Sequence, residues 1–279
     1  MLHRNVCASN SLKGWYSHGM KLVVLTIFPE LIQAFWDNGI MRRAGFSGAI
    51  ETCALNIRDF AQGRHRVTDD RPYGGGCGMV MKPEPLAAAL RSARQKAPRA
   101  PVVMLTPQGR RFDQEMAGDL AGHPELIFVC GRYEGIDERI GELFIDMEIS
   151  IGDFVLTGGE VAAMAVMDSV VRLLPGVLGN EDSAENDSFH NQRLDYAHYT
   201  RPPEFEGQTV PDVLLSGHHD QIAQWRSADA LWRTFVKRPD LLTELSAEET
   251  ALLRRWYREI ERIIHQPGVG GTDPSSGDR

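Results

Sequence analysis

The chain has 279 residues, of which 42% are hydrophobic and 24% are charged, and its formal net charge at pH 7 is −8. This composition is typical of a globular protein, and the length leaves room for one large or two modest domains. The negative charge argues against nonspecific nucleic-acid binding through a global basic field, but it leaves a local basic face open.

The four cysteines form no CxxC pair and no Cys/His pattern with zinc spacing. This usage predicts reduced thiols and a cytoplasmic location. No stretch approaches the length and apolarity of a membrane span. Residues 1–19 lack the apolar region of a secretory signal, so we expect a disordered upstream extension before Met20. The tail 266–279 is rich in Gly, Ser, Pro and Asp and is also expected to be disordered.

Apolar runs and helical patterns alternate along residues 20–178. Short apolar runs bounded by turn residues predict strands, here at 22–28, 50–57, 102–105, 126–130 and 153–156. Helical composition and spacing predict helices, here at 30–36, 83–97, 112–121, 136–144 and 160–174. This alternation predicts an α/β domain with a parallel sheet over residues 20–178.

The composition changes after residue 178. Gly, Asn, Asp, Glu and Ser dominate the next segment, which predicts a flexible linker over 179–195. Beyond it, helical patterns occur at 220–225, 229–236, 239–245 and 247–264. They predict a second, small and mainly helical domain over 196–265.

Three glycine-rich loops follow apolar runs of the first domain, at 107–109, 131–135 and 151–159. Glycine lets the backbone turn at positive φ or approach a ligand closely. Because the carboxyl ends of parallel strands meet at one edge of a sheet, the three loops are expected to form a crevice for a small cofactor. The alternative is that each loop is only a tight turn between a strand and a helix.

The polar segment 58–78 mixes arginines, carboxylates and glycines, with Arg64, Arg66, Asp69 and Arg71 at its centre. One guanidinium group can bind two phosphate oxygens at once, so this segment is a candidate for contact with phosphate or nucleic acid. The alternative is a solvated loop whose opposite charges pair with each other. It is not a P-loop, because no Gly-Lys-Ser/Thr follows.

Several charged residues near the loops have ordinary structural explanations. Asp137 has the position of a helix cap, whereas Glu134, between two glycines, has no such structural role and is the better candidate. Asp168 and Arg172 are spaced as an intrahelical ion pair of small worth. On so apolar a helix, such a pair also fits a face that meets a polar site or a partner chain. Asp187 lies in the predicted linker, where an isolated aspartate is usually solvated.

An ordered set of motifs carries a resemblance to a known family. The motifs are 69–76 (DDRPYGGG), 107–110 (PQGR), 130–139 (CGRYEGIDER), 150–156 (SIGDFVL), 158–160 (GGE), 175–179 (PGVLG), 187–189 (DSF) and 198–202 (HYTRP). Together they resemble the bacterial tRNA (guanine-N(1)-)-methyltransferases, the TrmD family of the SPOUT superfamily, from Met20 to about Ile264. Cys77, where the family often has proline, is the main departure.

The resemblance implies a SPOUT-class α/β fold with a deep trefoil knot, a homodimer with active sites between the subunits, and S-adenosylmethionine as methyl donor. The implied product is a methyl group on N1 of guanosine at tRNA position 37. The cofactor contacts of the family match Leu105, Thr106, Pro107, Gly131, Glu134, Ile151, Gly152, Asp153, Phe154, Val155, Leu156, Gly158 and Gly159. Mg²⁺ is a further ion to consider, without an assigned site.

The resemblance also supplies catalytic roles that the residues alone do not. The general base of the family matches Asp187, and the arginine that stabilises charge on the guanine oxygen matches Arg172. Contact with tRNA would then be local, through Arg64, Arg66, Asp69 and Arg71 and through the C-terminal helices. Two alternatives stay open: another SPOUT methyltransferase with a ribosomal RNA or ribose target, and a noncatalytic RNA-binding protein.

Overall fold

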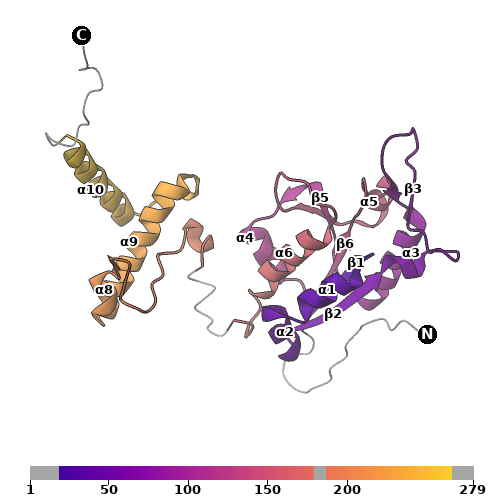
Figure 1. Ribbon diagram of the computed structural model, residues 1–279, viewed down its shortest axis with the longest axis horizontal. Coiled ribbons are helices and arrows are strands. Elements are labelled where there is room, and N and C mark those ends of the chain that lie inside the picture. Colours follow the sequence, from indigo (N-terminus) through magenta and orange to yellow (C-terminus); the bar gives the residue numbers. More distant parts are fainter. Residues whose placement is uncertain (1–18, 179–186, 266–279) are drawn as a thin grey trace, which may run out of the picture. The chain divides into compact units, whose positions relative to one another are not determined.

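A computed structural model describes residues 19–178 and 187–265, which form two compact units (Figure 1). We call residues 19–178 unit 1 and residues 187–265 unit 2. The expectations for residues 1–18, 179–186 and 266–279 lie outside the described residues. No described helix is both long enough and apolar enough to cross a membrane.

Strands and helices alternate along unit 1, as the sequence pattern predicted. The strands are β1 (Met20–Thr26), β2 (Ile50–Asn56), β3 (Asp69–Asp70), β4 (Val80–Met81), β5 (Val102–Arg111), β6 (Glu125–Cys130) and β7 (Met147–Ser150). The helices are α1 (Pro29–Trp36), α2 (Gly39–Phe46), α3 (Pro83–Lys96), α4 (Gln114–Ala121), α5 (Glu138–Phe144) and α6 (Glu160–Val171), with a 3₁₀ turn η1 (Ile57–Phe60).

Within the described part of unit 1, five strands form a parallel sheet in the order β2-β1-β6-β5-β7. This confirms the predicted α/β class and parallel sheet. Both faces of the sheet are covered: α1, α2, α4 and α6 pack on one face, and α3 and α5 pack on the other (Figure 1). In β1, Leu22 and Val24 enter the first core and Val23 and Leu25 the second. Strands buried on both faces read as continuous apolar runs, which is why the sequence revealed them.

Two expectations at the edge of the sheet are wrong. Residues 153–156 do not form a strand, and their apolar side chains are exposed, with Val155 88% exposed. The edge strand is β7, which lies six residues earlier in the chain than the expected strand. The predicted loop 107–109 lies inside β5, where the register against β7 shifts between Leu105 and Arg110. The expected loop is therefore a bulge in a strand.

Unit 2 is mainly helical. Its elements are η2 (His190–Gln192), β8 (Glu204–Phe205), β9 (Gln208–Thr209), α8 (Asp212–Leu215), α9 (His219–Lys237), η3 (Pro239–Leu241) and α10 (Ala247–Ile264). The helix predicted at 247–264 is confirmed, whereas the two predicted at 220–225 and 229–236 are one continuous helix, α9. The helix predicted at 239–245 is only the short turn η3.

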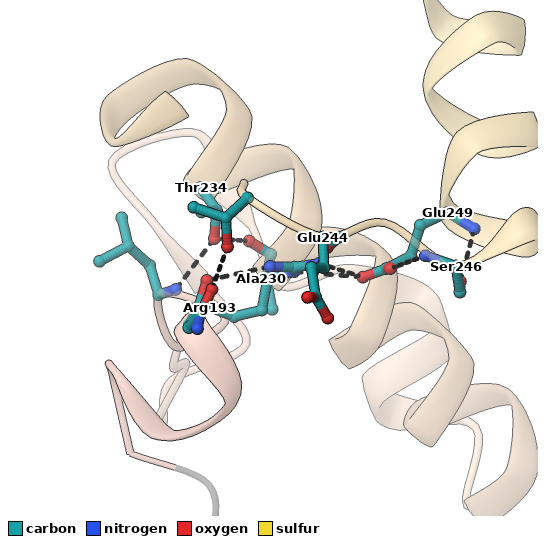
Figure 2. Close-up of polar contacts among 9 residues, drawn as sticks. Arg193, Ala230, Thr234, Glu244, Ser246 and Glu249 are labelled. Atoms are coloured by element: carbon teal, nitrogen blue, oxygen red, sulfur yellow. Dashed lines mark hydrogen bonds and ion pairs between the residues drawn. The ribbon is translucent and has the colours of Figure 1, made fainter. Parts of the chain in front are cut away.

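A set of polar contacts holds unit 2 together, and Figure 2 shows its centre. The Arg193 guanidinium donates to the Glu244 carbonyl oxygen (2.8 Å) and forms an ion pair with Glu249 (3.0 Å). The Leu194 N–H donates to the Thr234 hydroxyl of α9 (2.9 Å). Residues 193 and 194, which composition assigns to a linker, are thus bonded to α9 and to the start of α10.

Glu249 also belongs to the cap of α10. Its backbone N–H donates to the Ser246 hydroxyl (3.1 Å), and its carboxylate accepts from the Ser246 N–H (2.8 Å), which completes a capping box. Burial raises the pKa of Glu249, but the bonds from Ser246 and Arg193 outweigh it, so the pKa lies below its usual range. The contacts of unit 2 therefore stabilise the charged form of Glu249.

Candidate active site

A pocket of about 460 Å³ lies in unit 1 at the carboxyl ends of β6 and β7 and beside the bulge of β5. It is lined by residues 104–108, 131–136, 148–152 and 154–159, together with Val80, Glu138 and Ala162. The three glycine-rich segments singled out in the sequence thus meet around one cavity. This is the usual place for a ligand in an open parallel sheet.

Most of the residues nominated as cofactor contacts border this pocket. They are Leu105, Thr106, Pro107, Gly131, Glu134, Ile151, Gly152, Phe154, Val155, Leu156, Gly158 and Gly159. Asp153 is the exception, because it is absent from the described lining. Residues 154–156, which the sequence pattern assigned to a strand, border the pocket and are exposed instead of lying in the core.

The turn after β7 depends on Gly152. Its φ of +148° lies in the region that favours glycine, and a Cβ there would stand 2.6 Å from the Phe154 ring. The Phe154 N–H donates to the Gly152 carbonyl oxygen (3.0 Å), and the buried Ser150 hydroxyl bonds to both polar groups of Gly152. This local geometry directs the chain away from the sheet and along the pocket.

Two loops cross in contact at the far side of the pocket. Arg132 and Gly158 form an isolated antiparallel bridge, and the Gly159 N–H donates to the Gly131 carbonyl oxygen (2.9 Å). A Cβ at Gly158 would collide with the Arg132 side chain. A larger residue at position 158 would therefore have to displace the Arg132 side chain from its bonds to Glu160 and Thr157.

A buried ionic group, which we call the Arg132 cluster, fastens this crossing. It consists of Thr26, Phe28, Arg132, Thr157 and Glu160. The Glu160 side chain is fully buried; its carboxylate accepts from the Thr26 hydroxyl (2.7 Å) and from Arg132 Nε (2.9 Å). The Arg132 guanidinium also donates to the Thr157 carbonyl oxygen (3.2 Å) and lies 4.5 Å from the centre of the Phe28 ring. The cluster ties the end of β1, the loop after β6 and the start of α6 together.

Glu160→Ala is expected to lower the free energy of unfolding of unit 1 by about 3 kcal/mol, because removing one partner of a buried ion pair leaves the other uncompensated. The Arg132 side chain is 19% exposed and can regain some water, which places the effect at the low end of the range for such pairs. Hydrogen exchange of the β6 and α6 amides in urea measures it without a contribution from unit 2. The exposed Glu142→Ala is the control, and a loss no larger than that of the control would contradict the role of the cluster.

The charges around the pocket are mainly negative. Among the described lining residues, Glu134, Glu138 and Glu148 carry carboxylates, and the guanidinium of Arg132 is already paired with Glu160. The Glu134 backbone N–H donates to the Met79 carbonyl oxygen (3.0 Å), which fixes the main chain at this residue. The pocket therefore favours a ligand that carries positive charge.

Two neighbours of the pocket are excluded as reactive groups. Burial raises the pKa of the Cys130 thiol, and the charge of Glu160 raises it further, so the thiol stays neutral and is a poor nucleophile. Asp137 caps α5 by accepting from the Arg139 N–H (3.1 Å), and the Arg139 side chain lowers the pKa of its carboxyl. The capping explanation for Asp137 is thus the one that the structure supports.

Within unit 1, Arg172 is not among the lining residues of this pocket. α6 starts at the pocket and Arg172 follows its last residue, so a rise of 1.5 Å per residue puts about 18 Å between Glu160 and Arg172. The Arg172 N–H donates to the Asp168 carbonyl oxygen (3.3 Å) at that far end. Asp187 belongs to unit 2, where it is partly buried.

The nominated RNA contacts lie between η1 and β4 in unit 1. Arg64 and Arg71 are exposed. Arg66 forms an ion pair with Asp59 (2.7 Å), which agrees with the alternative that opposite charges of this segment pair with each other. Asp69 lies in β3, whose partner strand β4 contributes Val80 to the pocket. This segment is thus continuous with one wall of the pocket.

The Arg132 cluster was missed in the sequence. A glutamate in the first turn of a helix is ordinarily a solvated partner of the helix dipole, and nothing in the spacing connects Glu160 with Thr26. One signal was available, since Glu160 is followed by an unbroken apolar run from Val161 to Met167. No group of three or more His, Cys, Asp or Glu in residues 19–178 and 187–265 is arranged to hold a metal ion.

Comparisons with known proteins give consistent matches. The sequence model of the family described as tRNA (Guanine-1)-methyltransferase TrmD matches residues 20–244. The tRNA (guanine-N(1)-)-methyltransferase of Desulfatibacillum aliphaticivorans is 57% identical over 262 residues, which cover 93% of this chain and 100% of that protein. The enzyme of the same name from Geobacter sulfurreducens is 54% identical over 244 residues, 87% of this chain and 100% of that protein. The one from Geotalea uraniireducens is 53% identical over 249 residues, 89% and 100% of the two chains.

Proposed function

We infer the function from the premise that this chain belongs to the TrmD family of tRNA (guanine-1)-methyltransferases. It is an enzyme that transfers a methyl group from S-adenosylmethionine to N1 of a guanosine in tRNA. The finer proposal is that the target is guanosine 37, next to the anticodon. The ordered motifs from 69 to 202 support this proposal, and four of them, at 107–110, 130–139, 150–156 and 158–160, contribute residues to the lining of the pocket in unit 1.

The pocket of unit 1 has the properties that the methyl donor needs. Its volume of about 460 Å³ is in the range of pockets for small molecules. Glycines at 131, 152 and 158 border the pocket without a side chain, and Ile151 and Leu156 provide apolar surface for a flat ring. The carboxylate of Glu134 suits the positive charge of a sulfonium. We propose that these residues hold S-adenosylmethionine, which supplies an electrophilic methyl group there.

Guanine N1 carries a proton and is a poor nucleophile until that proton leaves. We propose that Asp187 accepts the proton as general base, after the target base has left its stack and entered the site. Loss of the proton moves negative charge toward the exocyclic oxygen of guanine. Arg172 then stabilises that charge by a charge-assisted hydrogen bond.

The position of Arg172 supports the proposed homodimer. Ala162 is the pocket-lining residue of α6, and a rise of 1.5 Å per residue puts Arg172 about 15 Å farther along the helix, which is beyond the reach of an arginine side chain. α6 is mostly apolar, with Asp168 and Ser169 as its polar residues after Glu160, and Val161 at its start is 52% exposed, as expected for a helix that a second copy of the chain partly covers. In this proposal the partner subunit supplies the arginine to each pocket.

Three further features belong to the same proposal. The trefoil knot is supported by the close crossing of the loops at Gly131 and Gly159. Local contact with tRNA through Arg64 and Arg71 is supported by their exposure beside β4. A cytoplasmic location follows from the RNA substrate and from the cysteine usage. Mg²⁺ has no residues assigned to it.

A methyl-transfer assay with radiolabelled donor tests the proposed function. A tRNA transcript with guanosine at position 37 is expected to incorporate one methyl group per molecule, and its adenosine-37 variant none. Mapping the label to N1 separates this activity from ribose methylation. Methylation of ribosomal RNA in place of the transcript would favour another SPOUT enzyme, and no incorporation into any RNA would favour a noncatalytic binding protein.

A further inference from the structure

Unit 2 has a cavity of its own that the methyl-transfer proposal does not use. Its volume is about 690 Å³, and it is lined by the segment 196–201 and by side chains from α8, α9 and the hairpin region before α8. Because all lining residues belong to unit 2, the cavity is defined by that unit alone.

The ionisable groups of this cavity share one sign. His198, Arg201 and Arg226 line it, and no Asp or Glu occurs among its described lining residues. This is unusual in unit 2, because residues 187–265 contain more Asp and Glu than Lys and Arg. The His198 ring is held in place by Asp195, which lies 2.8 Å from Nε2 and outside the lining. The cavity therefore offers an anion two guanidinium groups and a fixed imidazole.

Aromatic rings stand beside these cations. The Arg226 guanidinium lies 4.8 Å from the centre of the Tyr196 ring, and the Tyr196 and His198 rings lie 4.8 Å apart. Tyr199 remains 50% exposed, with its ring 6.2 Å from that of Trp225. An exposed ring next to guanidinium groups is the combination with which proteins bind unstacked nucleotides, the ring stacking on the base and the cation pairing with the phosphate.

We propose that this cavity is a subsite for one unstacked nucleotide of the RNA substrate, with its base on Tyr199 and its phosphate on Arg201. The inference rests on the proposed function for the identity of the substrate as RNA, and it adds a point of contact that belongs to unit 2. The volume of about 690 Å³ is ample for a single nucleotide. Contact by stacking tolerates any base, so the subsite contributes affinity more than sequence choice.

Binding of a fluorescently labelled tRNA transcript to the full-length protein tests the proposal. Tyr199→Ala and Arg201→Gln are each expected to weaken binding about tenfold, whereas Tyr199→Phe keeps the ring and stays within about twofold. Lys237→Gln is the control, because it removes one positive charge from an exposed position outside the cavity. Affinity for S-adenosylmethionine is expected to be unchanged in all four variants.

Tyr199→Ala and Arg201→Gln proteins that bind tRNA as well as Lys237→Gln would overturn the subsite. If Tyr199→Ala does not fold, Arg201→Gln decides alone, since that side chain is exposed. The methyl-transfer assay of the unaltered protein separates the two hypotheses. If the unaltered protein methylates guanosine 37 and the variants bind tRNA with unaltered affinity, only the subsite is refuted. If the unaltered protein transfers no methyl group but the variants bind tRNA more weakly, only the proposed function is refuted.

Discussion

Asp187→Asn is expected to lower the rate of methyl transfer to a guanosine-37 tRNA by at least about 100-fold, the contribution of a positioned general base. Asparagine has the size and shape of aspartate but cannot accept the N1 proton. Affinity for S-adenosylmethionine is expected to stay within about twofold of the unaltered protein, because Asp187 lies in unit 2 and the donor pocket in unit 1. Single-turnover kinetics and calorimetry measure the two quantities separately.

The Asp187→Asn test requires that the segment after Asp187 keeps its fold. The residues that follow it are anchored within unit 2: the Ser188 hydroxyl accepts from the Asp195 N–H (3.0 Å), and the Phe189 N–H donates to the Arg193 carbonyl oxygen (2.7 Å). These bonds do not involve the Asp187 carboxylate, so the segment is expected to keep its fold. Asp220→Asn, an exposed aspartate of α9, is the matched control. Turnover of Asp187→Asn within threefold of that control would refute the assigned base.

The strands of unit 1 were predictable where both of their faces are buried. β1 and β6 contain continuous apolar runs, at 22–25 and 126–130, so length and composition located them. β7 was not predictable in this way, because Met147 and Glu148 at its start are exposed. The apolar run at 153–156 resembles a buried strand only because its side chains surround a pocket, and residue type alone does not tell a pocket from a core.

The site shows the same division between local and nonlocal information. Glycine-rich loops at strand ends predicted the position of the pocket, because the edge at which parallel strands end is fixed by topology. The burial of Glu160 depends on segments that are 134 residues apart in the chain, Thr26 and the start of α6. Likewise, polar composition suggested a linker over 179–195. Arg193 at its end is nevertheless bonded to Glu244 and Glu249, which lie more than 50 positions away in the chain. Neither contact leaves a periodic or local pattern in the sequence.

Because Arg172 lies far along α6 from the pocket, we ask which chain supplies Arg172 to each pocket. Mixed dimers can answer this question. If a pocket and the Arg172 that serves it belong to different chains, a variant that fills the pocket and a variant that lacks Arg172 damage complementary halves of each site. Leu156→Trp is suited to the first purpose. Leu156 lines the pocket and is partly exposed, so the larger tryptophan side chain can extend into the cavity without disturbing the core. Arg172→Ala serves the second, with an expected loss of about 100-fold or more.

A dimer with Leu156→Trp in one subunit and Arg172→Ala in the other is expected to retain about half of the activity of the unaltered dimer, although each variant alone is inactive. One site of the mixed dimer then carries both defects and the other carries neither. If Arg172 acted on the pocket of its own chain, each site would carry one defect, and the mixed dimer would be as inactive as its parents. Co-expression with two different affinity tags isolates the mixed species, and calorimetry is expected to count one bound S-adenosylmethionine per mixed dimer and two per unaltered dimer. Inactivity together with that single donor site would assign Arg172 to its own chain and remove the argument for a shared active site.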